Sequence, residues 1–173
     1  NKIDYFQGSS KNVLDRYYKC AIKHKAGKIL RITSDCPLLE YKFVDNFLVK
    51  SQKKNFNYFS NCYLRTFPKG YDLEIFDFNT LKYCKINANS NYDKEHVTTY
   101  ILKNLSRFKF GSIKYKRNLY KKYRLTLDYM NDYFVIKNIF DKLYSQDKYF
   151  DLKKIINYLD KSNLWKINIK NNQ

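Results

Sequence analysis

The 173 residues carry 34 Lys and Arg against 16 Asp and Glu, a net charge of +18, and 44% of them are hydrophobic. This apolar share can form a core, which excludes disorder as the overall state, and no apolar run approaches the ~20 residues of a membrane span. The four cysteines, Cys20, Cys36, Cys62 and Cys84, form no C-x-x-C pair, which excludes a zinc-ribbon or redox motif and predicts reduced thiols in a cytoplasmic protein.

The first half of the chain alternates helical and extended patterns. Apolar residues at helical spacing follow Ser9 and Ser10, two N-cap candidates, and Gly27 is a stop signal. In chain order we predict a helix over 13–22, a strand over 28–33, a helix over 43–48, strands over 57–60 and 73–76 and a helix over 80–88. Asp35 therefore follows the end of a buried strand.

The second half continues the alternation. We predict a helix over 93–103, strands over 108–116 and 123–128, and helices over 132–143 and 152–159. Gly111 marks a bulge in the first of these strands, and Asp128 ends the second. Strands alternating with helices of about ten residues predict a single α/β domain over 1–173, a three-layer sandwich whose ligands gather at strand ends.

Asp35 and Asp128 thus share a predicted position at strand ends. Mg²⁺ binds through one or two carboxylates together with substrate phosphates and water, so such a pair is what it requires. The alternative is that each aspartate caps a neighbouring turn or helix, which is a frequent role for Asp. The spacing of the two residues does not choose between these interpretations.

Five blocks of sequence together resemble the cytidylyltransferase family of spore coat polysaccharide biosynthesis, which is similar to the CMP-Kdo and CMP-acylneuraminate synthetases. The blocks follow that family's order over nearly the whole chain. They are SKNVLDRYY at 10–18, RITSDCPL at 31–38, FPKGYDLE at 67–74, EHVT at 95–98 and RLTLDY at 124–129.

The resemblance implies a nucleotide-diphospho-sugar transferase fold, which is Rossmann-like, and transfer of CMP from CTP to a sugar hydroxyl with release of pyrophosphate. It places Mg²⁺ on Asp35 and Asp128. In that family Pro and Glu-Asp follow the second aspartate, whereas this chain has Tyr129-Met130-Asn131-Asp132, so only the final Asp matches. Relatives in the family are commonly dimers, and a homodimer is compatible with the resemblance.

Basic residues in the matching blocks are candidates to bind triphosphate or an acidic sugar. They are Arg16, Arg31 and Lys69. Arg31 interrupts an apolar strand, where an unpaired charge is costly, so it requires a partner such as Asp35 or substrate and is assigned a catalytic role. For Arg16 and Lys69 the alternative is a solvated helix face or surface.

The remaining candidates come from two of the blocks. Asp72 and Glu74 alternate on an extended segment, which places both on one face for sugar hydroxyls, or leaves them as a solvated pair. Glu95 starts a helix as a substrate-binding candidate, and His96 is a candidate general base because histidine titrates near neutrality. A lone histidine is, however, more often structural.

The family's Gly-rich, basic nucleotide-binding loop lies before the first block, and residues 1–7 do not resemble it. The sequence also opens without Met, so we expect this chain to be the C-terminal two-thirds of the enzyme domain, with the N-terminal part absent. The alternative is a truncated, non-catalytic binding or assembly module. Nucleic acid is the least favoured partner, since the basic residues are scattered and the composition resembles that of AT-rich coding sequence.

Overall fold

The computed structural model describes residues 3–172, which divide into two compact units. Within the described residues, the first unit comprises 3–31, 51–60 and 74–111, and the second comprises 32–50, 61–73 and 112–172. Each unit is therefore assembled from three separate stretches of chain. No described helix is both long enough and apolar enough to cross a membrane.

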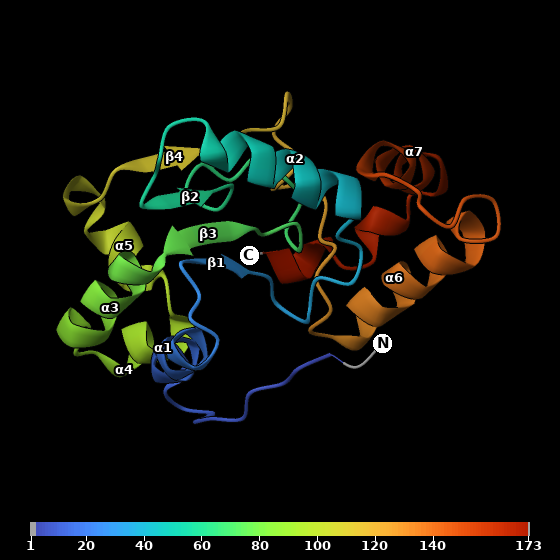
Figure 1. The fold of residues 1–173 in the computed structure, drawn as a ribbon. Coiled ribbons are helices and arrows are strands. Elements are labelled where there is room, and N and C mark those ends of the chain that lie inside the picture. Colours follow the sequence, from blue (N-terminus) through green and yellow to red (C-terminus); the bar gives the residue numbers. More distant parts are fainter. Residues whose placement is uncertain (1–2, 173) are drawn as a thin grey trace. The chain divides into compact units, whose positions relative to one another are not determined.

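The first unit is built on a four-stranded sheet (Figure 1). The strands are β1 (Lys28–Arg31), β2 (Tyr58–Ser60), β3 (Glu74–Asp77) and β4 (Phe110–Ser112), in the spatial order β1-β3-β2-β4. β3 runs antiparallel to both β1 and β2, so the carboxyl ends of β1 and β2 lie at the same end of the sheet. The chain is thus mixed α/β, as the alternation of patterns predicted.

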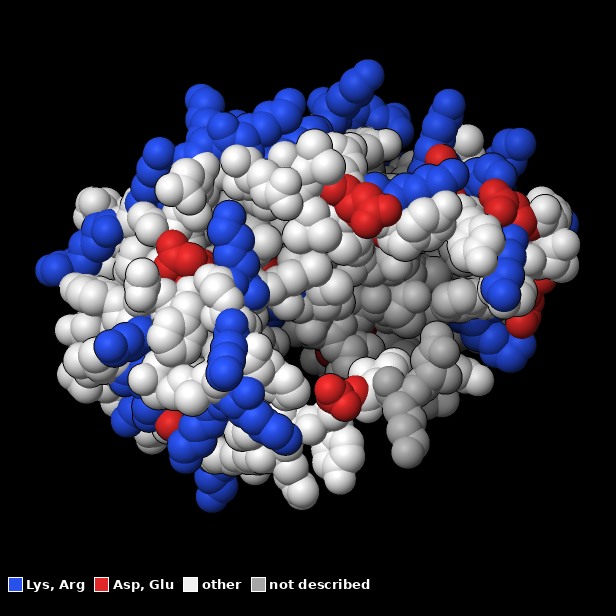
Figure 2. Space-filling model, in the orientation of Figure 1, with Lys and Arg blue, Asp and Glu red and all other residues white. Residues whose placement is uncertain are grey.

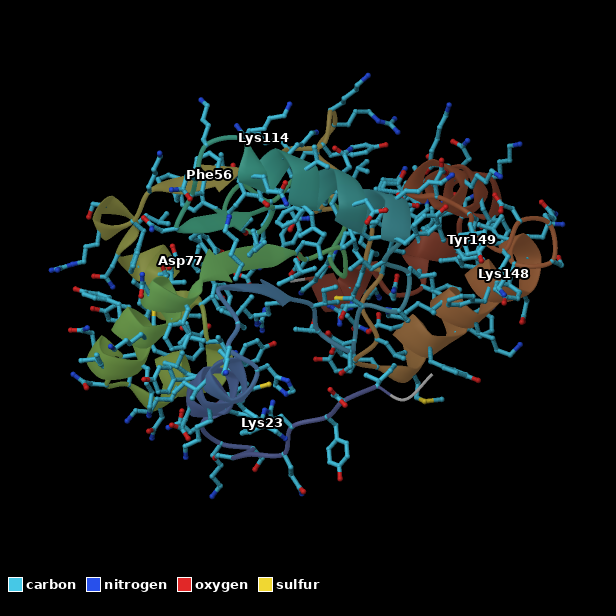
Figure 3. The ribbon with its side chains drawn as sticks, viewed as in Figure 1. Lys23, Phe56, Asp77, Lys114, Lys148 and Tyr149 are labelled. Carbon is cyan, nitrogen blue, oxygen red and sulfur yellow. The ribbon has the colours of Figure 1, made fainter. Side chains whose placement is uncertain are left out.

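Helices α1 (Val13–Lys23), α3 (Phe78–Asn87) and α4 (Asn91–His96) pack together beside this sheet (Figure 1). Buried apolar side chains from the helices and strands, among them Leu14, Tyr58 and Leu81, form one core. The N-cap of α1 is Asn12 rather than the predicted Ser9 or Ser10, because the Asn12 side chain accepts a hydrogen bond from the Asp15 amide. Helix α3 begins directly after β3, where Asp77 caps it (Figure 3).

The single helix predicted over 93–103 is wrong at its centre. The structure has two short helices, α4 and α5 (Thr99–Lys103), separated at Val97. Val97 is buried and has φ of 57°, a conformation that a β-branched residue rarely adopts and that ends an α-helix. Helical spacing of the apolar residues continues across the break, so the pattern alone did not reveal it.

The second unit is mainly helical. It contains most of α2 (Tyr41–Gln52), together with α6 (Met130–Leu143) and α7 (Leu152–Ser162). Short 3₁₀ helices occupy Leu164–Lys166 and Ile169–Asn172 here, and a third, Leu105–Arg107, lies in the first unit. The core of the second unit is formed by α6, α7 and the segments that precede them, with Leu125, Ile139 and Ile155 completely buried. The predicted helices over 43–48, 132–143 and 152–159 are confirmed.

Two of the predicted strands are corrected. The strand over 108–116 is reduced to β4, and the segment 123–128 is extended but forms only one isolated parallel bridge, between Lys69 and Arg124. Its partner segment begins with Pro68, which has no amide hydrogen, and turns at Gly70, so a longer ladder cannot form. Asp128 therefore ends a segment with one isolated bridge, not a sheet strand.

Positively charged side chains outnumber negatively charged ones on the surface. Figure 2 shows Lys and Arg side chains across much of the face drawn, with Asp and Glu in fewer places. This distribution agrees with the scattered basic residues of the sequence. The four cysteines are all free thiols, as predicted.

Candidate active site

The loop that carries Lys69 lies alongside the segment that leads to Asp128, both in the second unit. The Lys69 amide donates to the Tyr123 carbonyl at 3.2 Å, and the Leu125 amide donates to the Lys69 carbonyl at 2.7 Å. Gly70 follows with φ of +95°, and a Cβ there would lie 2.4 Å from the Leu125 backbone. Only glycine allows this approach, which brings the PKG turn against the extended segment.

Asp35 is bound to the same extended segment. The Thr126 hydroxyl donates to Asp35 Oδ2 at 3.2 Å, and the Leu127 amide donates to the Asp35 carbonyl at 2.9 Å. Asp128 is the next residue, so standard backbone dimensions place the Cα atoms of Asp35 and Asp128 within about 11 Å of each other. The two predicted metal ligands, 93 positions apart in the sequence, therefore lie on neighbouring segments of one unit.

The carboxyl group of Asp35 is held in its ionised form. Partial burial alone would raise its pKa, but hydrogen bonds from Thr33, from its own backbone and from Thr126 outweigh burial and lower the pKa below its usual value. The neighbouring Cys36 thiol shows the opposite effect, since burial raises its pKa to about 11. Asp35 is thus an anion at neutral pH, and Cys36 is a neutral thiol.

Asp128 is bound by a buried arginine. Arg124 Nη2 donates to Asp128 Oδ2 at 2.5 Å, and the same guanidinium makes a two-point contact with Asp132, with Nε 2.9 Å from Oδ1 and Nη2 3.0 Å from Oδ2. The side chains of Arg124 and Asp132 are 2% and 0% exposed, whereas that of Asp128 is 45% exposed. Asp128 is the accessible carboxylate of this network.

Two further basic residues, Arg65 and Lys69, lie close enough to interact electrostatically with Arg124 or with the carboxylates around it. Arg65 pairs with Asp72 at 3.0 Å, which accounts for the charge of Asp72. Lys69 forms no ion pair among the described residues, and its pKa is lowered, first by burial and then by repulsion from Arg124. Lys69 is therefore a basic side chain of the site without a carboxylate partner among the described residues.

A second cluster of predicted residues lies in the first unit. Arg31 Nη1 donates to Glu74 Oε2 at 2.6 Å, and the Tyr58 hydroxyl donates to Glu74 Oε1 at 2.6 Å. Glu74 thus supplies a partner for the half-buried Arg31 charge, one that the sequence did not suggest. Glu74 is 3% exposed and both its oxygens are occupied, so this contact connects strands β1, β2 and β3.

Asp72 and Glu74, for which one common face was expected, are divided between the two units. Glu74 begins β3 in the first unit, whereas Asp72 precedes the strand and pairs with Arg65 in the second unit. The extended pattern does not continue back to Asp72. The two carboxylates therefore occupy different environments.

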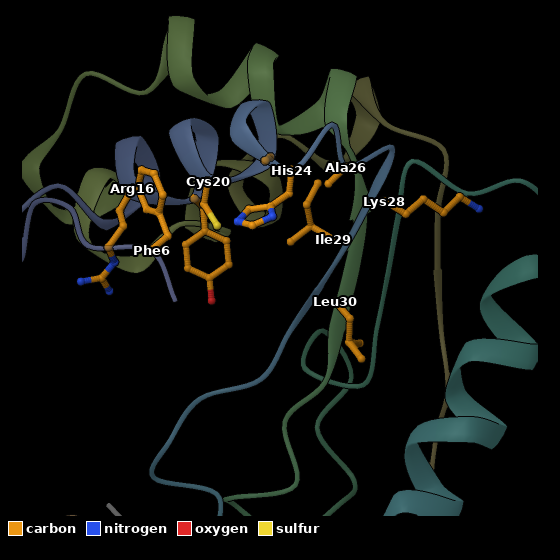
Figure 4. Close-up of a pocket in the computed structure, with 10 residues that line it drawn as sticks. Phe6, Arg16, Cys20, His24, Ala26, Lys28, Ile29 and Leu30 are labelled. Atoms are coloured by element: carbon orange, nitrogen blue, oxygen red, sulfur yellow. The ribbon is translucent and has the colours of Figure 1, made fainter. Parts of the chain in front are cut away.

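Arg16 lines a pocket of about 390 Å³ in the first unit (Figure 4). The pocket lies between α1 and β1, and its other lining residues are mostly apolar, including Phe6, Tyr17 and Ile29. Arg16 is partly exposed. Its predicted contact with phosphate or sugar stays a prediction.

Glu95 and His96 end helix α4 in the first unit and are exposed. The His96 ring lies 4.3 Å from the Tyr92 ring, one turn earlier on the same helix. The two rings are tilted by 55° to each other, a packing contact within the helix, and no described contact adds support for a general base. Glu95 stands at the end of the helix rather than at its predicted start.

The sequence analysis missed three residues that the structure places at the centre of the site: Arg124, Thr126 and Asp132. Arg124 interrupts an apolar extended run just as Arg31 does, so the same argument about buried charge would have identified it. Asp132 occupies the matching position of the family pattern. Thr126 has no distinguishing signal, because its role depends on contact with Asp35, 91 positions away.

The site has a donor set that fits a divalent ion only in combination with other ligands. Among the described residues there is no cluster of three or more His, Cys, Asp or Glu side chains that could hold a metal alone. Two aspartates, one of them half exposed, fit the one or two carboxylates that Mg²⁺ uses beside phosphate and water. The residues therefore fit a magnesium ion that arrives with a nucleotide.

A family model described as cytidylyltransferase matches residues 2–167. The chain belongs to the cytidylyltransferase family. A solved structure of a cytidylyltransferase from Leptospira borgpetersenii serovar Hardjo-bovis is 30% identical, with a TM-score of 0.85 over 92% of this chain and 67% of that one. This similarity confirms the expected family and the expected nucleotide-sugar transferase fold.

Two curated relatives extend the family comparison. An uncharacterized protein of Methanocaldococcus jannaschii is 34% identical over 167 residues, which is 92% of this chain and 64% of that protein. The spore coat polysaccharide biosynthesis protein SpsF of Bacillus subtilis is 30% identical over 139 residues, which is 79% of this chain and 57% of SpsF. The chain thus spans less than two thirds of the length of these two relatives.

Proposed function

We propose that the protein containing this chain transfers CMP from CTP to a sugar hydroxyl and releases pyrophosphate, for the synthesis of a surface polysaccharide or glycan. Family membership and the similarity to SpsF support nucleotidyl transfer in polysaccharide synthesis. The observation that carries the assignment of the site is the binding of Asp35 by Thr126 and Leu127, beside Asp128.

In this reaction the sugar hydroxyl oxygen forms a bond to the α-phosphorus of CTP. The bond from that phosphorus to the bridging oxygen breaks, pyrophosphate leaves with its electron pair, and the hydroxyl proton passes to a base. We propose that Asp35 and Asp128 hold Mg²⁺, which would neutralise charge on the phosphate oxygens. Asp35 is suited to this role because its hydrogen bonds keep it ionised.

Lys69 is proposed to bind an anionic group of the substrates. It lacks a carboxylate partner among the described residues and lies near Arg65 and Arg124, so a negative ligand would relieve their mutual repulsion. A sugar carboxylate or a nucleotide phosphate would serve, and an acidic sugar is our choice for the acceptor. Glu74 is left out of the proposed site, since both its oxygens are occupied within the sheet.

The test is pyrophosphate release by the complete natural protein, with each of the four nucleoside triphosphates and a panel of acidic and neutral sugars. We expect release with CTP and an acidic sugar. Asp35→Asn and Asp128→Asn should each lower kcat/KM by about 10²–10³-fold, the magnitude found when a group that stabilises transition-state charge is removed.

Asp141→Asn is the matched control, because Asp141 is an exposed aspartate of the second unit whose one ion pair within residues 3–172 is with Lys137 on the same helix. Its activity should equal that of the wild type. Full activity of Asp35→Asn would contradict the proposed role of Asp35. Absence of nucleotidyl transfer with every sugar, together with retained binding of CTP or sugar, would favour the alternative of a non-catalytic binding module.

A further inference from the structure

The buried guanidinium of Arg124 connects two aspartates that differ in accessibility. Asp132 accepts hydrogen bonds from Arg124, from the amides of Asp128 and Tyr129 at 3.1 Å each, and from Asn168 Nδ2 at 2.9 Å. All of these donors bind a carboxylate that is 0% exposed. Asp132 is therefore saturated by the protein and has no oxygen left for a ligand.

Asp128 has the opposite character. Its Oδ2 accepts from Arg124 at 2.5 Å, while its Oδ1 has no hydrogen-bond donor among the described residues, and the side chain is 45% exposed. One oxygen is thus held and the other is available. The Tyr129 ring, 5.4 Å from the guanidinium carbon, covers another side of Arg124.

We propose that Arg124 is a positioning residue that fixes the Asp128 carboxylate for a divalent cation, an inference that rests on the proposed function. Arg124 and Asp132 form a two-point pair with no net charge, so the pair orients Asp128 without placing an uncompensated positive charge beside the ion. The neutral pair leaves the full negative charge of Asp128 to the cation.

Asn168, near the C-terminal end of the described residues, belongs to the same hydrogen-bond network. Asn168 Nδ2 donates both to the Arg124 carbonyl at 3.0 Å and to Asp132 Oδ1 at 2.9 Å, and Asn168 is buried. The Arg124 backbone and the Asp132 side chain are thereby held by one amide group. The orientation of Asp128 depends in this way on a residue 40 positions further along the chain.

Arginine is required here because its planar fork reaches both carboxylates at once. A lysine ammonium keeps the charge but is a point donor on a flexible stem, so it cannot reproduce the two-point pair with Asp132 and the bond to Asp128 together. Arg124→Lys should therefore fold, with the buried charge of Asp132 still neutralised, and lose the orientation of Asp128.

The test is Mn²⁺ binding by the complete natural protein in the presence of CTP, measured from the electron paramagnetic resonance signal of the free ion and corrected for the Mn²⁺ that CTP binds without protein. Arg124→Lys should weaken Mn²⁺ binding by about 10-fold or more, the range found for residues that orient metal ligands. Arg117→Lys is the matched control, since Arg117 is an exposed arginine of the second unit, and should bind Mn²⁺ as the wild type does. Circular dichroism must show that each variant is folded.

A double variant separates positioning from a general effect on stability. If Arg124 acts through Asp128, then adding Arg124→Lys to Asp128→Asn should cause no further loss of Mn²⁺ affinity. Equal affinity of folded Arg124→Lys and wild type, or an additive loss in the double variant, would overturn the positioning role while leaving the metal site intact. No Mn²⁺ binding by the wild type beyond that of CTP alone would instead remove both this inference and the proposed metal site.

Discussion

Gly70 is the residue whose conformation most directly shapes the candidate site. Its φ of +95° requires glycine, and so does its backbone contact, because any Cβ at this position would lie 2.4 Å from the Leu125 backbone. The carbonyl of the preceding Lys69 accepts the hydrogen bond that joins the two segments. The position of Lys69 beside Arg124 therefore depends on the absence of a side chain at its neighbour.

Gly70→Ala should destabilise the protein by about 2–4 kcal/mol, because the new Cβ collides with backbone and the left-handed conformation is strained. Chemical denaturation monitored by circular dichroism measures this change. Gly27→Ala is the matched control, since a Cβ there meets nothing within 4 Å and no positive φ is required. It should be neutral or stabilise by up to about 1 kcal/mol. Equal stability of the two variants would contradict this account.

Sequence reasoning succeeded at single residues where the signal is local. The placement of Asp35 shortly after a strand followed from the apolar run and Pro37, and β1 does precede it, but β1 ends at Arg31 and is only half-buried, not buried as expected. The partner of Arg31 was predicted to exist, because a charge within an apolar strand requires one, but Glu74 was not among the partners that the sequence suggested. Glu74 pairs with Arg31 through the antiparallel register of β1 and β3, and such a register is not readable from one sequence.

At the scale of elements, helix α7 is the one whose start depends on a distant acid. Glu40 Oε2 accepts from the Leu152 amide at 3.0 Å, at the first turn of α7, while Asp151 caps the same helix. Burial and the negative charge of Asp151 raise the pKa of Glu40 to about 7. A carboxylate at a helix N-terminus is favourable, but here burial has the larger effect on the pKa.

Glu40 should make the stability of the folded protein depend on pH. Its folded pKa lies above its unfolded value, so the native state binds more protons between about pH 4.5 and 7, and stability falls as the pH rises through that interval. Glu40→Gln keeps an acceptor and removes the charge. The variant should match the wild type near pH 4.5 and exceed it by about 1–2 kcal/mol above pH 7, after allowance for the partial exposure of Glu40.

Denaturant unfolding measured at several pH values tests this prediction. A constant stability difference between Glu40→Gln and wild type from pH 4.5 to 8 would contradict it. A variant that is less stable above pH 7 would show that the ionised carboxylate favours the helix more than burial disfavours it.

Periodicity predicted most elements of the fold, and its failures have physical causes. The helices α1, α2, α3, α6 and α7 and the strands β1, β2 and β3 lie where the patterns placed them. The helix over 93–103 is interrupted at Val97 by a backbone conformation that residue type does not indicate. The strand over 123–128 failed because strand formation needs a partner, and its neighbour contains Pro68 and Gly70.

The candidate site depends on long-range contacts to a greater extent than the elements do. Family resemblance named Asp35 and Asp128, but neither composition nor spacing could show that Thr126 bonds to Asp35 or that Arg124 binds two aspartates. Asn168, which bonds to Arg124 and Asp132, lies further still along the chain, and no sequence pattern indicates these contacts. Side chains that orient a ligand are thus the part of the site that one sequence reveals least.

At the scale of the whole molecule, the two compact units are interleaved along the chain. Each consists of three stretches, so neither can fold without ordering connections that belong to the other. Each unit has its own buried core, one including Leu81 and the other Leu125. The prediction of a single domain can therefore be tested by asking whether the two units unfold together.

We expect one cooperative unfolding transition. Leu81→Ala in the first unit and Leu125→Ala in the second should each cost about 2–5 kcal/mol, as is usual for a fully buried leucine. Trp165, the single tryptophan, packs against the core of the second unit, so its fluorescence reports that unit. Leu81→Ala should lower the denaturant concentration at the unfolding midpoint equally whether unfolding is followed by fluorescence or by circular dichroism. An unchanged midpoint in fluorescence would show that the units unfold independently.

The central claim is that Asp35 and Asp128 hold one divalent ion beside CTP. Anomalous diffraction from crystals of the complete natural protein grown with Mn²⁺ and CTP tests it most directly. We predict an anomalous peak with oxygens of both aspartates and of the α-phosphate at about 2.1 Å from the ion, the spacing of octahedral oxygen ligation. A peak bound to other residues, or Asp128 turned away from an ion that Asp35 binds, would contradict the account.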